Sequence, residues 1–237
     1  MKKIKKFTLS FLLIIATLIA ISGVVLHQKT YQASSEAQTA AKTAENTKDY
    51  LFFQSSGTEA SIVFYQGALV EETAYASLAK NLAQEGFDVY LLKTPLNLSV
   101  LSSNKALKVI AKNNLSNVYL AGHSLGGVVA CLNAADSESQ AISGLILLAS
   151  YPSEKTDLSD SDLKVLSITA SNDNVLQWDN YEKAKKHLPD DTEYLTIVGG
   201  NHSGFGDYGK QTKEGKATIS QTEQENQIIS AITDFID

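Results

Sequence analysis

The sequence predicts an α/β protein in which a mostly parallel sheet carries helices on both faces. From residue 61 onward, short apolar runs alternate with stretches whose apolar residues recur at helical spacing. The connections between the apolar runs are too long for hairpins, so consecutive strands should run parallel and be joined by helices. The continuous apolar run 143–149 is typical of a central strand covered on both faces.

The expected elements follow one another along the chain. Runs rich in β-branched and aromatic residues predict strands over 50–54, 61–65, 87–92, 117–121, 143–149, 164–169 and 193–198. Helical spacing of apolar residues predicts helices over 73–84, 102–113, 125–135, 180–187 and 222–236. Ser56-Gly57-Thr58 is a hairpin-like signal between the first two strands, so we expect these two strands to pair.

Residues 1–26 predict a membrane anchor. Lys2, Lys3, Lys5 and Lys6 precede an uncharged apolar run from Phe7 to Leu26. A helix of this length rises about 30 Å, which matches the hydrocarbon core of a bilayer. The lysines predict a cytoplasmic N-terminus, with the rest of the chain outside the cytoplasm.

A cleaved signal peptide is the alternative to an anchor. The apolar regions of signal peptides usually span about 7–15 residues and end at a small-x-small site. This run is longer, and His27-Gln28-Lys29-Thr30-Tyr31 after it offers no good site. We therefore expect a single-pass protein of the cell membrane with an extracytoplasmic domain, and secretion after cleavage is the second possibility.

Residues 27–48 are predicted to be a polar linker. Ala, Ser, Thr, Gln and Glu dominate this segment, and no aromatic residue follows Tyr31 in it. Such a composition is typical of a solvated connecting segment, part of which can be helical. The folded domain is expected to span residues 49–237, which are enough to bury one sizeable core.

Charge and cysteine content exclude several classes of protein. The formal net charge is −6, and without the four N-terminal lysines the chain carries about −10. Such a surface repels phosphate backbones, so nucleic acid is not an expected partner. Cys131 is the single cysteine, so no internal disulfide can form, and no Cys/His cluster has the spacing of a zinc site. Because Cys131 falls within a predicted helix, we expect it to be buried in the core.

The most informative motif of the chain lies in residues 118–128. A strand leads into Gly122-His123-Ser124-Leu125-Gly126, a Gly-x-Ser-x-Gly pattern, and a helix follows. A serine hydroxyl becomes a useful nucleophile only when a base removes its proton, and a tight strand-to-helix turn projects it toward that base. The N–H of Leu125, at the start of the helix, would face a developing oxyanion. We predict that Ser124 is a nucleophile.

Two other interpretations of the motif are weaker. One is a glycine-rich turn with an incidental serine, because the five-residue pattern alone arises by chance in many proteins. The other is a phosphate-binding loop, but the chain contains no GxxxxGK[ST] sequence. The strand before the motif, the helix after it and the additional Gly127 favour the nucleophile.

The acid and the base are expected after two later strands. With this motif, the chain order is serine, then acid, then histidine. Asp173 lies in the polar turn after strand 164–169, and His202 lies in the glycine-rich turn after strand 193–198. The carboxyl ends of parallel strands share one edge of a sheet, so both side chains should lie near Ser124. His202 would accept the serine proton, and Asp173 would hold the imidazole.

Each of these assignments has an alternative. Asp173 could do no more than form its turn, in which case Asp179 is the fallback acid. His202 could be an ordinary loop histidine. The other histidines are weaker candidates for the base, since we expect His123 to shape the turn, His187 to lie on the surface and His27 to lie near the membrane.

A second oxyanion donor is expected in the loop after strand 61–65. Gly67 allows close approach of the backbone, and the N–H of Ala68 could point inward. The sequence does not decide between Gly67 and Ala68.

Several segments together resemble one known family. They are Phe64-Tyr65-Gln66-Gly67 followed by Ala74-Tyr75-Ala76-Ser77-Leu78-Ala79, then Pro95-Leu96-Asn97-Leu98, Ala121 to Gly127, and Gly199 to Gly209. On these segments the chain resembles a small-domain, lidless family of bacterial membrane-associated serine hydrolases in the α/β-hydrolase superfamily. The likeness covers nearly all of residues 50–237, and the last segment is its most specific part. It implies an α/β-hydrolase fold and hydrolase activity through the triad predicted above.

Two positions in these segments need comment. Relatives tend to have a second glycine where Ala68 stands, and a methyl group there could narrow the oxyanion loop. Asp207 and Tyr208 accompany the histidine motif, and we expect them to serve local loop structure.

The expected substrate is a small ester or a similar acyl compound. In this fold a cap domain commonly follows the strand that here ends at Ala149, but only residues 150–162 are available, so we expect a minimal cap or none. An open, shallow pocket walled partly by residues 94–101 would favour small acyl groups over long lipids. The chemistry needs no metal and no organic cofactor. Besides its substrate, the membrane is the only expected partner, and the sequence does not determine an oligomeric state.

Two functions of other kinds remain open. One is an extracellular binding module that kept the fold without catalysis. The other is an acyltransferase with the same triad, because water and an acceptor alcohol compete for one acyl-enzyme.

Overall fold

The computed structural model describes residues 28–57, 60–136 and 141–237. The chain divides into two compact units, residues 1–30 and 31–237, and the second unit is the domain discussed below. The predicted apolar segment Phe7–Leu26 and His27 lie outside the described residues. Within the described ranges, no helix has the length and apolar character needed to cross a bilayer.

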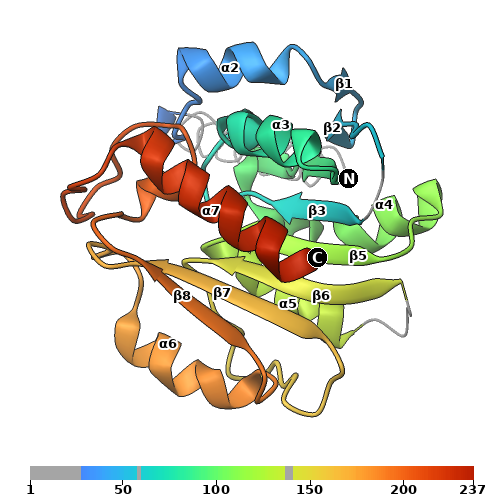
Figure 1. Cartoon of the computed structure of the whole chain (residues 1–237), viewed down its shortest axis with the longest axis vertical. Coiled ribbons are helices and arrows are strands. Elements are labelled where there is room, and N and C mark those ends of the chain that lie inside the picture. The colour runs from blue at the N-terminus through green and yellow to red at the C-terminus, as the bar shows by residue number, and fades with distance from the viewer. Residues whose placement is uncertain (1–27, 58–59, 137–140) are drawn as a thin grey trace, which may run out of the picture. The chain divides into compact units, whose positions relative to one another are not determined.

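The domain is built on an eight-stranded sheet in the order β1-β2-β4-β3-β5-β6-β7-β8 (Figure 1). The strands are β1 (Glu45–Asn46), β2 (Tyr50–Phe53), β3 (Ser61–Tyr65), β4 (Asp88–Leu92), β5 (Val118–His123), β6 (Ile142–Leu148), β7 (Lys164–Ala170) and β8 (Glu193–Ile197). From β4 across to β8 all neighbours are parallel, and β2 is antiparallel to both β1 and β4. The prediction of a mostly parallel sheet is confirmed.

The predicted hairpin between the first two long strands was wrong. β4 lies between β2 and β3, with Tyr50 opposite Leu92 and Ile62 opposite Val89. β4 can occupy this place because its side chains Val89 to Leu92 are buried on both faces of the sheet. The turn signal at Ser56-Gly57 therefore marks a loop that leads past β4 and not a hairpin.

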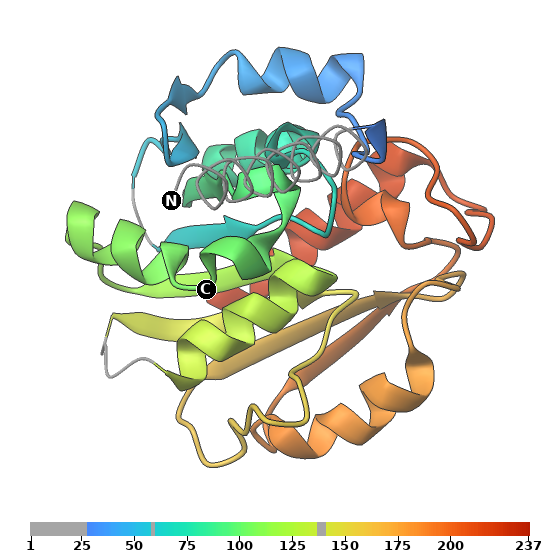
Figure 2. The ribbon, with the colours of Figure 1, turned by 180° about the vertical axis from the view of Figure 1, so that it is seen from behind.

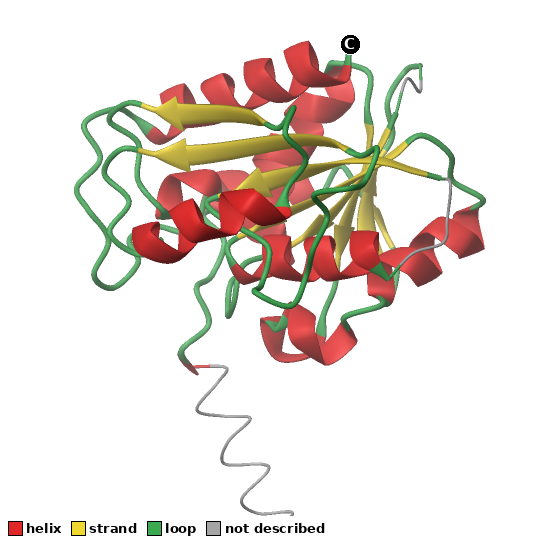
Figure 3. Ribbon diagram, turned by 90° about the horizontal axis from the view of Figure 1, so that it is seen from below, coloured by secondary structure: helices red, strands yellow, loops and turns green. Residues whose placement is uncertain are grey.

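Helices cover both faces of the sheet. They are α2 (Ser35–Ala41), α3 (Ala76–Gln84), α4 (Lys105–Asn113), α5 (Leu125–Ala135), α6 (Trp178–Ala184) and α7 (Gln221–Ile236). In β3, Ile62 and Phe64 belong to a core cluster with α3 and α7, whereas Val63 and Tyr65 belong to a second cluster with α4 and α5. This alternation is the period of two expected of a strand buried on both sides. Figures 2 and 3 show the second helical layer and the fan of strands between the layers.

The expected burial of Cys131 is confirmed. Cys131 is buried within α5, and burial raises the pKa of its thiol to about 12, so it acts as an inert apolar side chain.

Residues 149–163, which connect β6 to β7, contain no helix or strand, so no cap domain covers the sheet at this point.

The predicted linker over residues 27–48 was wrong for its larger part. Tyr31 forms a parallel bridge with Val70, and α2 buries Ala37 and Ala40 in the same core cluster as α3. Alanines spaced three and four residues apart give α2 a small apolar face, which the polar composition of the segment concealed. The folded domain therefore begins at Tyr31 and not near Asp49.

Candidate active site

The Gly-x-Ser-x-Gly segment forms a tight turn between β5 and α5. Ser124 has φ 53° and ψ −122°, a conformation that L-residues rarely adopt. Such strain persists where the surrounding structure imposes it, and it projects the serine side chain beyond the strand. The predicted strand, turn and helix are therefore all present.

Two glycines make this turn possible. A Cβ atom at Gly122 would lie 2.3 Å from the backbone carbon of Gly126, and one at Gly126 would lie 2.2 Å from the carbonyl oxygen of Tyr65. Real Cβ atoms essentially never approach other atoms this closely. The absence of side chains thus allows the end of β3, and the loop that follows it, to pack directly against the turn.

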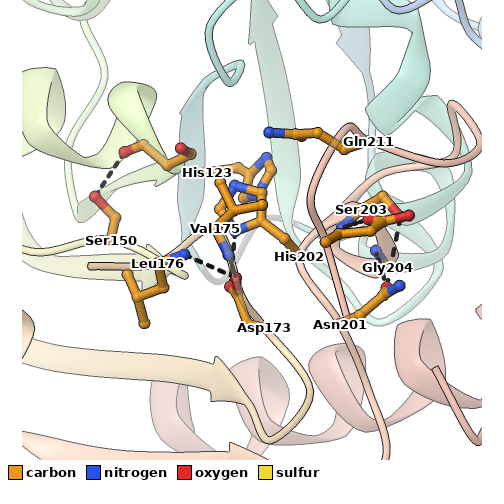
Figure 4. A network of polar contacts seen from close by, with 12 residues as sticks. His123, Ser150, Asp173, Val175, Leu176, Asn201, His202, Ser203, Gly204 and Gln211 are labelled. Atoms are coloured by element: carbon orange, nitrogen blue, oxygen red, sulfur yellow. Dashed lines mark hydrogen bonds and ion pairs between the residues drawn. The ribbon is translucent and has the colours of Figure 1, made fainter. Parts of the chain in front are cut away.

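Ser150 supports the turn from the neighbouring strand end, a role that the motif did not reveal. Its hydroxyl donates a 2.6 Å hydrogen bond to the carbonyl oxygen of Ser124 (Figure 4). A Cβ atom at Gly127 would lie 2.5 Å from that hydroxyl, so the third glycine of the motif leaves room for it.

His202 and Asp173 form a buried pair. His202 Nδ1 lies 2.7 Å from Asp173 Oδ2, and each residue is only 1% exposed. His202 Nε2 is buried and has no hydrogen-bond partner among the described residues. With the Nδ1 proton donated to the carboxylate, Nε2 carries the free lone pair that a general base needs.

Asp173 both forms its turn and contacts His202, which the sequence analysis gave as alternatives. Its Oδ1 accepts 2.8 Å hydrogen bonds from the backbone N–H groups of Val175 and Leu176, which form the turn, while Oδ2 accepts from His202 (Figure 4). The turn therefore fixes the carboxylate that orients the imidazole. Asp179, the fallback acid, lies exposed in the first turn of α6.

The loop that carries His202 is fixed by α7. Gln224 accepts a 3.0 Å hydrogen bond from Asn201 N–H through Oε1 and donates through Nε2 to the Asn201 carbonyl at 2.9 Å. A Cβ atom at Gly204 would lie 2.1 Å from Gln224 Oε1, which explains one glycine of the motif. Sequence reasoning missed Gln224, although a buried glutamine on the inner face of an amphipathic helix is the signal that could have found it.

Ser124 and His202 line the same small pocket. It has a volume of about 220 Å³, and its other lining residues are Leu125, Val128, Ala149, Ser150, Tyr151, Val175, Leu176 and Gln177. The lining is mostly apolar around the serine. Residues 94–101, which we expected to form one wall, are not part of this lining, and residues 175–177 take that place.

The two predicted positions for the second oxyanion donor differ in their hydrogen bonding. The N–H of Gly67 donates to the Tyr75 hydroxyl at 3.0 Å and is therefore occupied. Ala68 is exposed, and its N–H makes no hydrogen bond to any described residue. Leu125 is the first residue of α5, where backbone N–H groups lack partners within the helix. Ala68 and Leu125 thus remain available as donors.

His123 occupies the position before the serine but has a different environment from His202. Its ring lies 4.5 Å from the His202 ring, and its Nδ1 lies 2.8 Å from the Tyr75 hydroxyl. That hydroxyl also accepts a hydrogen bond from Gly67 N–H, so Tyr75 links the loop after β3 to the His123 ring. Burial, and secondarily the neighbouring His202, hold the pKa of His123 well below its ordinary value, so its ring stays neutral.

Two further points from the sequence concern the position of His187 and metal binding. His187 follows α6, and its ring lies 3.7 Å from Asp157; it is partly buried, which the expectation of a surface position did not foresee. Across the described part of the chain, no three His, Cys, Asp or Glu side chains are grouped so that they could hold a metal ion.

Comparison with known proteins places this arrangement in context. A sequence profile of the alpha/beta hydrolase family matches residues 61–226. No curated protein sequence matches the chain.

Solved structures match the fold at low sequence identity. A monoacylglycerol lipase from Paleococcus ferrophilus has 13% identity and a TM-score of 0.59, over 78% of this chain and 98% of that one. A soluble variant of monoglyceride lipase from Saccharomyces cerevisiae has 12% identity and a TM-score of 0.58, over 82% and 94%. A thermophilic esterase from Thermogutta terrifontis has 10% identity and a TM-score of 0.56, over 79% and 86%.

Proposed function

The chain belongs to the alpha/beta hydrolase family, and from this premise we propose that it cleaves an ester or similar acyl bond with Ser124 as nucleophile. His202 is the proposed general base and Asp173 the residue that orients it. The observation that carries the proposal is the buried 2.7 Å contact between His202 and Asp173 at the edge of the pocket that also contains Ser124.

The proposed reaction has two halves. His202 Nε2 accepts the Ser124 proton while the serine oxygen bonds to the carbonyl carbon, and the oxyanion forms beside the N–H groups of Leu125 and Ala68. The intermediate collapses, the leaving alcohol takes the proton from His202, and an acyl-serine remains. Water then gives a proton to His202 and attacks the acyl-serine. The acid is released as the serine oxygen takes that proton from His202, which restores both residues.

The shape of the pocket supports a small acyl group. A pocket of about 220 Å³ lies below the range of about 300–1,000 Å³ that is usual for drug-sized ligands. Val128, Val175 and Leu176 provide apolar walls beside the serine. Monoacylglycerol lipases and an esterase are among the structurally similar proteins, which is in keeping with an ester substrate.

We also propose that the enzyme works at the extracytoplasmic face of the cell membrane. The support is the apolar run 7–26 behind its lysine cluster. An anchored enzyme should stay in membranes after a carbonate wash, and external protease should digest its domain in spheroplasts. Recovery of a shortened chain in the culture medium would favour signal cleavage instead.

Fluorophosphonate labelling of the full chain tests the activity. We expect the wild type and Ser159→Ala, which removes an exposed hydroxyl, to be labelled and to hydrolyse p-nitrophenyl acetate. Ser124→Ala should not be labelled, and its rate of ester hydrolysis should be lower by about 10⁴-fold or more. A folded wild type that is not labelled would favour a binding module. Ester products that appear at the expense of free acid when glycerol is added would favour acyl transfer.

A further inference from the structure

We propose that residues 31–34, which we call the N-terminal clasp, position the oxyanion donor Ala68 for the reaction proposed above. The inference rests on that proposed function and extends it to residues far from the motifs. Two loops are involved, the oxyanion loop (Gly67–Val70) and the histidine loop (Gly199–Tyr208). The clasp makes hydrogen bonds or ring contacts with both.

The clasp holds the oxyanion loop through backbone hydrogen bonds. Tyr31 N–H donates to the Leu69 carbonyl at 2.7 Å, and the Tyr31 carbonyl accepts from Glu71 N–H at 3.1 Å. Ala33 N–H donates to the Glu71 carboxylate at 3.1 Å. The clasp thus runs beside the residues that directly follow Ala68, in the manner of an added strand.

This contact matters because the loop contains a residue in an unfavourable backbone conformation. Ala68 is exposed, and the next residue, Leu69, has a φ of 58°, a left-handed conformation that is unfavourable for leucine. Around Ala68, Gly67 N–H is held by Tyr75, Leu69 N–H by the Asn97 carbonyl, and the Leu69 carbonyl by Tyr31. The Gly67 carbonyl, in the same peptide as the Ala68 N–H, accepts from Val70 N–H at 3.2 Å. Without the clasp, the Leu69 carbonyl next to this turn loses its partner, and the loop that carries Ala68 is held by one bond fewer.

The same segment also binds the histidine loop. Ser34 N–H donates to the Asp207 carbonyl at 2.8 Å, and the Ser34 hydroxyl donates to the Asp207 carboxylate at 2.5 Å. The rings of Tyr31 and Tyr208 lie 5.5 Å apart. Asp207 and Tyr208 therefore have a function beyond their own loop, because they join the loop of the proposed base to the clasp.

The clasp leads into α2 at Ser34, the N-cap of the helix, whose hydroxyl accepts a 3.1 Å hydrogen bond from Ala37 N–H. The apolar contacts of this region come from Ala37 and Ala40 on the helix, which lies beside α3 (Figure 1), and from Ala33 and Tyr31 in the clasp. The contacts to the oxyanion loop come from backbone groups ahead of the helix. A substitution that removes a backbone donor in the clasp can therefore leave the helix in place.

Proline substitution in the full chain tests the inference. Tyr31→Pro removes the N–H that binds Leu69 and the ring that contacts Tyr208, so it breaks the clasp at both loops. Ser35→Pro places proline at the first residue of α2, where no N–H partner is lost. The substrates are p-nitrophenyl acetate and its thionoester. A thiocarbonyl sulfur accepts hydrogen bonds poorly, so the ratio of the two kcat values reports on the oxyanion donors.

We expect Tyr31→Pro to lower kcat for the ester by about 10- to 100-fold, with little change in KM, and to reduce the preference for ester over thionoester. Ser35→Pro should keep both values. Equal losses on ester and thionoester, or a Tyr31→Pro variant as active as Ser35→Pro, would overturn the inference. If Tyr31→Pro does not fold, Asp207→Ala is the deciding variant. We expect it to lose less of the preference for ester over thionoester. An unchanged ratio of the two kcat values would contradict the clasp. Failure of the proposed function would appear separately, as activity that survives in Ser124→Ala.

Discussion

The two sides of the proposed reaction centre are held in different ways. On one side, Ser124, Asp173 and His202 each follow the end of a strand. Buried contacts fix them, and these involve the turn glycines, the Val175 and Leu176 N–H groups, and Gln224. On the other side, Ala68 is exposed, and its loop depends on Tyr31, Tyr75 and Asn97. Strand ends and buried contacts therefore position the triad, whereas the exposed Ala68 depends on the hydrogen bonds that its neighbours in the loop make.

This difference indicates where substitutions should act. Changes on the triad side should remove the chemistry itself, because a proton carrier or its orientation is lost. Changes on the oxyanion side should weaken stabilisation of the transition state in part, because one donor moves while the other, Leu125, stays at the helix start.

Asp173→Asn tests the triad side with the largest effect. An amide at this position can donate as well as accept, and it no longer stabilises the charged imidazolium, so kcat should fall by about 10³- to 10⁴-fold. Asp179→Asn is the matched control, because Asp179 is the fallback acid and its side chain is exposed on α6. Steady-state hydrolysis of p-nitrophenyl acetate measures both. A larger loss in Asp179→Asn would reverse the assignment of the acid.

Tyr75→Phe tests the oxyanion side. The hydroxyl links Gly67 N–H to His123 Nδ1, so its removal frees the oxyanion loop and leaves two buried polar groups without their partner. We expect kcat to fall by about 10- to 100-fold with little change in KM. The control is Tyr50→Phe, which loses a hydroxyl that contacts Asn113. Equal activity of the two variants would mean that Tyr75 contributes to stability alone.

The same contrast explains what the sequence could predict. The triad side was accessible because Ser124, Asp173 and His202 stand next to apolar runs, and the parallel sheet then determines that they meet. The β2–β3 hairpin and the linker were mispredicted because β4 inserts between two neighbouring strands, and because alanines in a polar segment conceal a buried helix face. Tyr31, Tyr75 and Asp207 were inaccessible as site residues because their partners lie far away along the chain or in neighbouring loops.

Substitution of His123 should have the smallest effect of these changes, and we expect that effect on the stability of the fold. Burial holds its folded-state pKa well below the unfolded value of about 6.5, so the unfolded chain binds more protons as the pH falls below that value. Its contribution to stability is therefore complete above about pH 6.5 and declines as the pH falls toward the folded-state pKa, by at most about 1.4 kcal/mol per pH unit. Above pH 6.5 the imidazole is neutral in both states, and His123 adds no pH dependence.

Urea unfolding of the wild type and His123→Asn from pH 7.5 to 5 measures this contribution. The variant loses the titrating ring and keeps every other ionisable group, so the two free energies of unfolding should run parallel above pH 6.5 and converge below it. A constant difference over the whole range would show that His123 is protonated equally in the folded and unfolded chain. Convergence would show instead that the His123 ring beside His202 stays neutral in the folded protein, as its burial predicts.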